Sequence, residues 1–265
     1  ISDMPSDATK SLAVTPLSTI VSAAETAEAK AKVLTALGIT GEVEDVLTKD
    51  VWKEAQEGDA DAKAIQKVNT QVATVIKTAQ AVVKSGSSTA VTAVAVSKAV
   101  AKEVAAKTAT ETSVDLTKSD TVEAVLKETV EEVVTDSTEA AAVVDKVDAV
   151  AEAVAEANAV VAAREDPTAA AEVAEAASLQ DAITSKADEL VQGTITEAEF
   201  DTQTTASTVL AEVDTDGDGT VNSSDDDDDG DGVADASDAF PLDAAESVDT
   251  DSDGTGNNAD TDDDG

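Results

Sequence analysis

Hydrophobic residues recur at helical spacing through most of the chain. Within each of three stripes, successive members lie mostly three or four positions apart, which places them on one face of a helix. The stripes are Ile65, Val68, Val72, Val75, Ala79 and Val82; Val122, Leu126, Val130 and Val133; and Val143, Val147, Val150, Val154, Ala157 and Val161. The pattern predicts a succession of amphipathic helices that bury one face each.

Residues that favour helix ends divide this region further. Helix starts are predicted at Thr15-Pro16, at Asp166-Pro167 and at three capping boxes, Asp120/Glu123, Asp136/Glu139 and Thr196/Glu199. Helix ends are predicted at Gly38, Gly58, Ser85 to Ser88, about Lys107, Gly193 and Leu210. The expected helices include 15–37, 42–56 and one that runs through the whole third stripe.

The composition of the stripes predicts a thin core. Apolar residues are almost all Ala, Val, Leu and Ile, and aromatic residues make up 1% of the chain. Small side chains let helices approach closely but bury little surface each. We expect Trp52, Phe200 and Phe240 to act as packing anchors. Besides forming the core, the Ala/Val stripes offer surfaces for self-association into an oligomer or a fibre.

Charge narrows the classes of function. The chain has 57 Asp and Glu against 17 Lys and Arg, a net charge of −40, and it contains no His and no Cys. Such a balance argues against nucleic-acid or anionic-membrane binding, which needs clustered basic residues. The absence of His and Cys also removes the usual zinc ligands and the commonest general base. No apolar run is long enough to span a bilayer, and we expect no enzyme.

Half of the net charge lies in a tail that contains no Lys or Arg, residues 214–265. Three twelve-residue segments there carry oxygen side chains at positions 1, 3, 5, 9 and 12 and Gly at position 6. We call them loop 1 (residues 214–225), loop 2 (227–238) and loop 3 (249–260). A fourth copy begins at Asp260 and reaches Gly265, so we expect the natural polypeptide to continue.

This spacing suits a hard cation. Calcium takes six to eight oxygens, Gly at position 6 permits the sharp turn, and the backbone carbonyl of position 7 adds a ligand. A disordered acidic tract would have no reason to keep these positions three times. The predicted ligands are Asp214, Asp216, Asp218, Thr220, Asn222 and Asp225; Asp227, Asp229, Asp231, Val233, Asp235 and Asp238; Asp249, Asp251, Asp253, Thr255, Asn257 and Asp260; and Asp262 and Asp264. Neighbouring loops could share ligands within residues 225–229.

Two known calcium motifs can be compared with the loops. An EF-hand fits poorly, because position 12 is Asp in place of the usual Glu and no amphipathic helix follows any loop. The pattern resembles thrombospondin type 3 repeats, and Asp238-Ala-Phe-Pro-Leu-Asp243 is similar to the spacer between such repeats in large surface proteins of marine bacteria. The resemblance covers about a fifth of the chain and implies tandem Ca²⁺ loops with little regular secondary structure.

The helical region has a weaker resemblance. The segments Thr15-Pro-Leu-Ser-Thr-Ile-Val21, Ala36-Leu-Gly-Ile39, Gly58-Asp-Ala60 and Gln71-Val72 are similar to a helical part of long bacterial surface proteins and adhesins. There the entry is Asn-Pro, and the likeness fades after about Val83. It implies an extracellular, cell-surface or periplasmic location and says nothing about activity.

The sequence therefore predicts an all-α, Ala/Val-rich helical bundle followed by an irregular calcium-loop repeat tail. Its expected parts are a linker or strand (1–14), a helical region (15–212) and the repeats (213–265), and a division into two sub-bundles would fall near 85–89 or 108–119. The expected function is a Ca²⁺-binding structural protein with a stiff connector, partnered by further copies or other surface proteins. The alternative is a spacer or tether whose binding domain lies outside this chain. Halophilic adaptation would explain part of the negative charge of the helical region but not the repeat.

Overall fold

The computed structural model describes residues 15–24, 26–40, 43–110, 113–211, 213–216, 218, 220–222, 225–250 and 256–258. All regular structure in these ranges is helical, as the sequence predicts. The helices are α1 (Pro16–Ala23), α2 (Ala27–Ala36), α3 (Val43–Thr48), α4 (Val51–Gln56), α5 (Ala60–Gly86), α6 (Ala93–Thr110), α7 (Ser119–Val133), α8 (Ser137–Val144), α9 (Val147–Ala163), α10 (Ala170–Val191), α11 (Glu197–Thr204), α12 (Ala206–Leu210) and the short 3₁₀ helix η2 (Asp235–Ser237). The expected linker or strand at 1–14 lies outside the described residues.

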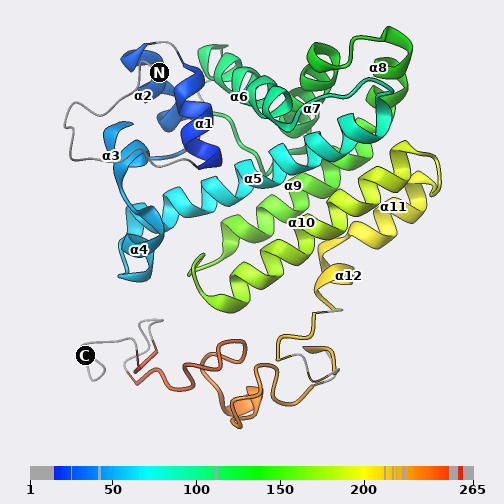
Figure 1. Cartoon of the computed structure of the whole chain (residues 1–265). Helices are drawn as coiled ribbons and strands as arrows, with labels where there is room; N and C mark the ends of the chain where they lie inside the picture. Colours follow the sequence, from blue (N-terminus) through cyan, green and yellow to red (C-terminus); the bar gives the residue numbers. More distant parts are fainter. Residues whose placement is uncertain are drawn as a thin grey trace.

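The longest helix, α5, forms the centre of the bundle. It packs against α1, α4, α6, α9 and α10. Helices α7 and α9 pack against each other, and α11 and α12 both pack against α10. Figure 1 shows α5, α9 and α10 running side by side through the middle of the molecule. The bundle is thus organised around one central helix.

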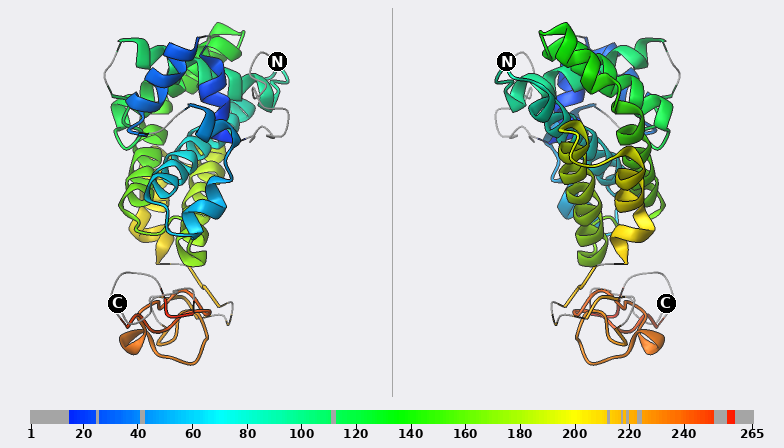
Figure 2. Two further views of the ribbon diagram at one scale, coloured as in Figure 1. Left: turned by 90° about the vertical axis from the view of Figure 1, so that its left-hand side faces the viewer. Right: turned by 90° about the vertical axis from the view of Figure 1, so that its right-hand side faces the viewer.

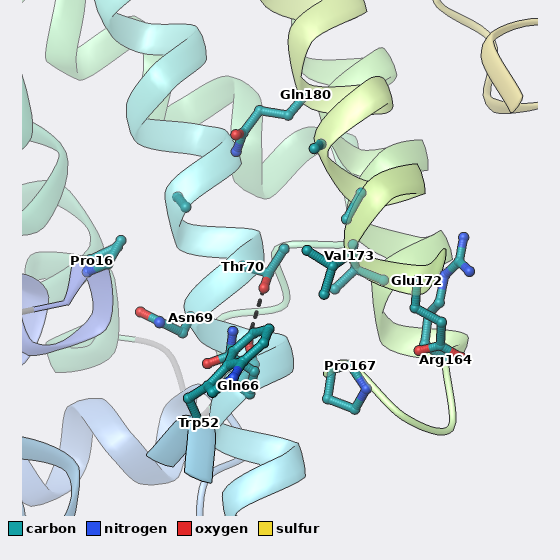
Figure 3. A pocket seen from close by; sticks show the side chains of 14 residues that line it. Pro16, Trp52, Gln66, Asn69, Thr70, Arg164, Pro167, Glu172, Val173 and Gln180 are labelled. Carbon is teal, nitrogen blue, oxygen red and sulfur yellow. Dashed lines mark hydrogen bonds between the residues drawn. The ribbon is translucent and has the colours of Figure 1, made fainter. Parts of the chain in front are cut away.

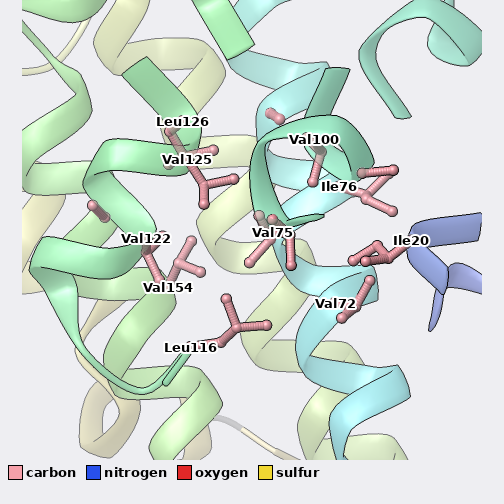
Figure 4. Packing of buried hydrophobic residues seen from close by; sticks show 14 of the residues in the cluster. Ile20, Val72, Val75, Ile76, Val100, Leu116, Val122, Val125, Leu126 and Val154 are labelled. Atoms are coloured by element: carbon pink, nitrogen blue, oxygen red, sulfur yellow. The ribbon is translucent and has the colours of Figure 1, made fainter. Parts of the chain in front are cut away.

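The core is built from the predicted stripes. Val72, Val75 and Val82 on α5 and Val150 and Val154 on α9 are buried. Figure 4 shows branched side chains of several helices meeting between α5, α6, α7 and α9. One hydrophobic cluster extends from α1 to α12. Alternating Val and Ala lets the helices approach closely, which is how a chain with few aromatic residues closes a core.

Gly86 is a point of close approach between helices. An added Cβ there would overlap Cγ2 of Val143 on α8 and would also press on Val191 of α10. The sequence predicts that Ser85 to Ser88 interrupts the helix, and α5 indeed ends at Gly86. The glycine serves close packing at that end, in addition to stopping the helix.

Several helices are shorter than the sequence predicts. The expected helix 15–37 divides at Ala24, and Thr26 caps α2 by accepting a hydrogen bond from the amide of Ala29 (3.1 Å). The expected helix 42–56 divides in the same way, with Asp50 capping α4. Side chains of Thr and Asp accept backbone hydrogen bonds and so favour a new helix start. The hydrophobic pattern does not reveal such breaks, because the apolar face continues across them.

Two further helices also divide. The third stripe is split at Asp145 and Lys146 into α8 and α9, although Val143 and Val147 on either side are both buried. The last expected helix is split at Thr205 into α11 and α12.

The capping predictions have mixed outcomes. Thr196 and Glu199 form a complete capping box, and Asp136 caps α8 through the amides of Thr138 and Glu139. The prediction for Asp120 is wrong: Lys118 is the N-cap and α7 begins at Ser119, so Asp120 lies in its first turn. The predicted start at Asp166-Pro167 is also displaced. There the Asp166 carboxylate accepts hydrogen bonds from Thr168, and α10 begins at Ala170.

The three large aromatic residues have different environments. Phe200 on α11 is fully buried, as predicted. Trp52 is 39% exposed, so its predicted role as a packing anchor is wrong. Phe240 is partly exposed and lies in the tail, outside the main core cluster.

Beyond α12 the described chain has almost no regular structure. Figure 2 shows this tail as an irregular coil that extends past the end of the helices and includes the short helical turn η2. Among the described residues, no helix is both long and apolar enough to cross a membrane.

Candidate metal-binding loops

Loop 1 brings three predicted ligands together. Asp214, Asp216 and Asp218 each offer a carboxylate oxygen, and these oxygens lie within 4.8 Å of one another. Two turns produce this arrangement. The Asp216 side chain accepts a hydrogen bond from the amide of Asp218 (2.9 Å), and the Asp218 side chain accepts one from Thr220 (2.7 Å). Each such turn curls the chain by two residues, so alternate aspartates come to face one point.

Loop 2 repeats the arrangement with more burial. Oxygens of Asp227, Asp229 and Asp231 lie within 4.8 Å of one another, and Asp229 is only 7% exposed. Asp229 accepts a hydrogen bond from the amide of Asp231 (3.1 Å), and Asp231 accepts one from Val233 (2.7 Å). The same turns therefore recur at the same positions of the repeat.

Four carboxylates of loop 2 each keep one buried oxygen that accepts no hydrogen bond from the described residues. These are Oδ1 of Asp227, Oδ1 of Asp228, Oδ2 of Asp229 and Oδ2 of Asp238, and all but Asp228 stand at predicted ligand positions, namely 1, 3 and 12. In Asp227 and Asp229 the other oxygen is occupied, by the amides of Gly232 and Asp231. A buried anionic oxygen without a partner is costly. Hard oxygen donors of this kind are the ligands that calcium prefers.

The electrostatics of loop 2 point the same way. Burial raises the pKa of Asp229, and the carboxylates of Asp231, Asp238 and Asp227 raise it further, although the hydrogen bond from the Asp231 amide acts against them. The contribution of the carboxylates, a mutual repulsion, follows from their short separation, since the oxygens of Asp227, Asp229 and Asp231 lie within 4.8 Å of one another. A divalent cation at their centre would remove that repulsion.

Asp228, at position 2 of loop 2, has the largest pKa shift among the described residues. Burial, followed by the carboxylates of Asp235, Asp225, Asp229 and Asp216, raises its pKa to about 6. Asp216 belongs to loop 1, so the charges of the two loops are coupled.

Loops 1 and 2 also pack directly against each other. Gly230 has a φ of +70°, which other residues rarely adopt, and a Cβ there would lie 2.7 Å from Oδ2 of Asp216 and displace that side chain. Asp225, at position 12 of loop 1, accepts a hydrogen bond from the amide of Asp227 (3.0 Å), which begins loop 2. The last ligand predicted for loop 1 thus also shapes the start of loop 2.

The position-9 residues make a different contact from the one that the sequence suggests. The side-chain oxygen of Asn222 accepts a hydrogen bond from the amide of Thr215 (3.0 Å), and its NH₂ group donates to Oγ1 of Thr215 (2.8 Å). Asn257 binds Thr250 in the same way, at 2.9 and 2.7 Å. We call this pairing of positions 2 and 9 the clasp. It joins the start of a loop to its far side.

One residue outside the twelve-residue pattern is missed by the sequence analysis. Glu246, in the segment between loops 2 and 3, is 8% exposed and accepts a hydrogen bond from the amide of Asn258 (2.9 Å). Its side chain passes close to Gly256, where a Cβ would clash with it. The only sequence signal is the glycine at position 8 of loop 3. Glu246 thus joins the spacer to loop 3.

Several predicted ligands lie outside the described residues: Asp251, Asp253, Thr255, Asp260, Asp262 and Asp264. The predicted carbonyl ligands Thr220 and Val233 each follow a turn, to which they donate their amides. The assembled clusters are therefore those of loops 1 and 2.

The helical region contains a hollow of about 310 Å³ between α4, α5 and α10. Figure 3 shows Trp52 lying beside Gln66 and Thr70, with Pro167 and Val173 across the opening. Arg164, the single arginine of the chain, lines one edge and pairs with Glu175. Trp52 thus lines the hollow and remains partly open to solvent.

No protein-family model, no curated protein and no solved structure gives a match to this chain.

Proposed function

We propose that the tail binds Ca²⁺ and that the chain is a structural protein in which the ion-filled loops form a stiff connector behind a helical bundle. The observation that carries this proposal is that three of the four buried oxygens of loop 2 that accept no hydrogen bond from the described residues lie at positions 1, 3 and 12. These are positions at which the repeat pattern predicts ligands, so geometry and sequence agree on the same residues.

Calcium suits this set better than magnesium. Mg²⁺ requires near-octahedral geometry and keeps several of its waters, whereas Ca²⁺ accepts six to eight oxygens in flexible arrangements. Loops 1 and 2 each offer three carboxylates within 4.8 Å, with further oxygens at positions 7 and 12. Zinc is a poor candidate because the chain has no His and no Cys.

The acidity of the loops also fits an extracellular, cell-surface or periplasmic location. The acid at position 12 is Asp throughout, and it lacks the reach of the bidentate Glu of tight intracellular sites. Loops of modest affinity fill where calcium is abundant, as in extracellular modules. The resemblance to thrombospondin type 3 repeats supports the same location.

The helical bundle is the proposed packing or self-assembling part. Its surface carries the remaining half of the negative charge, so association between copies or with other surface proteins would be favoured by bound cations. The alternative proposal is that this chain spaces a binding domain that lies elsewhere in a longer adhesin or outer-membrane protein. Either role is non-enzymatic and depends on a connector whose stiffness comes from calcium.

Small-angle scattering tests the connector. We expect the full chain to be more extended and more flexible with a chelator, because repulsion among the tail carboxylates is then unopposed. In calcium the maximum dimension and the flexibility should both fall. If the two scattering profiles superimpose, the connector proposal loses its mechanism.

A pair of variants ties the effect to the site. Asp229→Asn removes the buried ligand charge, and we expect it to weaken the calcium response by about tenfold or more in midpoint. Asp226→Asn makes the same change at an exposed residue that is not a predicted ligand. Equal responses in both variants would mean that bulk charge, without a defined site, causes the compaction.

A further inference from the structure

The clasp differs among the three loops in a way that bears on the order in which they form. In loops 1 and 3 it joins a threonine to an asparagine, Thr215 with Asn222 and Thr250 with Asn257. In loop 2 the corresponding residues are Asp228 and Asp235, two carboxylates. The backbone parts of the clasp are nevertheless the same.

The shared part is a pair of hydrogen bonds. In loop 1 the amide of Asn222 donates to the carbonyl of Val213 (2.7 Å), and Thr215 donates its amide to Oδ1 of Asn222 (3.0 Å). In loop 2 the amide of Asp235 donates to the carbonyl of Asp226 (3.0 Å), and Asp228 donates its amide to Oδ1 of Asp235 (3.0 Å). Both loops therefore close along the same path of the chain.

The side chains then make the difference. In loop 1 the clasp gains a third hydrogen bond, from Nδ2 of Asn222 to Oγ1 of Thr215 (2.8 Å), between neutral groups. In loop 2 neither carboxylate can donate, and Oδ1 of Asp228 is buried and accepts no hydrogen bond from the described residues. Two like charges held together oppose closure, whereas a neutral hydrogen-bonded pair favours it. The corresponding amide contacts are partly buried in both loops, so exposure does not account for the contrast.

We propose that the clasp decides which loop needs the ion to close: loop 1, with its Thr215–Asn222 pair, closes without a cation, and loop 2, with Asp228 facing Asp235, closes only when calcium arrives. This inference rests on the proposed calcium binding. It makes loop 2 the ion-dependent joint of the tail and gives Asn222 and Asn257 a positioning role in place of direct coordination. Loop 3 carries the neutral pair as well, in a more exposed setting.

Backbone hydrogen exchange on the full chain tests the inference directly. The two amides to compare are those of residues 215 and 228, because each donates to the position-9 side chain of its loop. In chelator we expect the amide of Thr215 to be protected at least about tenfold more than that of Asp228. In calcium both should be protected. Equal protection of the two amides in chelator, while calcium still binds, would overturn the inference.

Reciprocal exchange of the clasps provides the matched control. Asp228→Thr with Asp235→Asn gives loop 2 the neutral pair, and its amide at position 228 should become protected in chelator. Thr215→Asp with Asn222→Asp gives loop 1 the charged pair, and the amide at position 215 should then require calcium. Unchanged protection in both double variants would contradict the assigned role of the clasp.

The number of bound ions separates the possible failures. If the exchanged loop 2 binds one ion fewer than the parent chain, the two charges of Asp228 and Asp235 serve to hold the ion and not to oppose closure, and the inference is overturned while calcium binding stands. If the parent chain binds no calcium at all, the proposed function fails. The inference fails with it, although the difference in protection measured in chelator would still describe the clasp.

Discussion

At the scale of single residues, the informative feature of the tail is which carboxylate oxygen is already occupied. In loop 2 one oxygen of Asp229 accepts an amide and the other is buried without a hydrogen bond from the described residues. The turn hydrogen bonds thus orient each aspartate, and this orientation would allow the cluster of carboxylates to bind a cation. Charge alone would leave both oxygens in water.

The raised pKa of Asp228 predicts a pH dependence in the absence of metal. Because the pKa is raised in the folded loop, to about 6, the protonated form stabilises loop 2. That stabilisation is complete below the ordinary pKa of an aspartate and is lost as the pH rises through about 6. With chelator present, we expect protection of the Gly232 and Asp235 amides to be about tenfold greater at pH 4 than at pH 7.5, less than the full shift implies because of solvent screening.

Asp228→Asn is the control for this pH effect. An amide at this position is neutral at every pH, so loop 2 should keep its acid-state protection at pH 7.5. Protection factors, which correct for the intrinsic pH dependence of exchange, are the measurement. If the variant loses protection with rising pH as the parent does, Asp228 is not the cause of the pH dependence. The cause would then lie in the groups that face it, namely Asp235, Asp225, Asp229 and Asp216.

At the scale of helices, we expect replacement of Gly86 by alanine to lower the stability of the bundle, which is the opposite of the usual effect. Replacing a helical glycine with alanine ordinarily stabilises a helix by about 0.5–1 kcal/mol. Here the new methyl group would overlap Val143, so we expect Gly86→Ala to destabilise the bundle by about 1–3 kcal/mol in denaturant unfolding. Adding Val143→Ala should recover part of the loss, and a stabilised single variant would refute this packing.

Hydrophobic periodicity and helix-capping residues predict different parts of the fold. The stripe on α5 predicts its buried face, and of its members only Val68 is partly exposed. Periodicity reports the face of a helix and not its continuity, which is why the breaks at Ala24 and Asp145 are missed. Asp136 is correctly predicted as a cap and Asp120 is not, because both fit the same local pattern and only tertiary packing fixes where α7 begins.

The tail is predictable in a different respect. Strict spacing predicts which aspartates cluster, and the structure brings Asp214, Asp216 and Asp218 together, as it does Asp227, Asp229 and Asp231. The clasp could not be predicted, because an amide at position 9 serves equally well as a ligand or as a hydrogen-bond partner of position 2. Glu246 is missed because its partner, the amide of Asn258, lies twelve residues away.

At the scale of the whole molecule, the bundle depends on many small side chains and one buried ring. Phe200 is fully buried, so Phe200→Ala should cost about 3–5 kcal/mol and lower the melting temperature by about 10 °C. Trp52→Ala should cost much less, because Trp52 is 39% exposed and borders the hollow. Thermal unfolding followed by circular dichroism compares the two. A larger loss for Trp52→Ala would contradict this description of the core.

The whole account depends on the tail being a set of defined cation sites. Isothermal titration of the full chain with calcium, at moderate ionic strength, measures this most directly. The account predicts saturable binding with a stoichiometry close to one ion per complete loop, and with little competition from magnesium. Heat that does not saturate, or that magnesium abolishes at equal concentration, would show a diffuse counterion atmosphere in place of sites and would contradict the account.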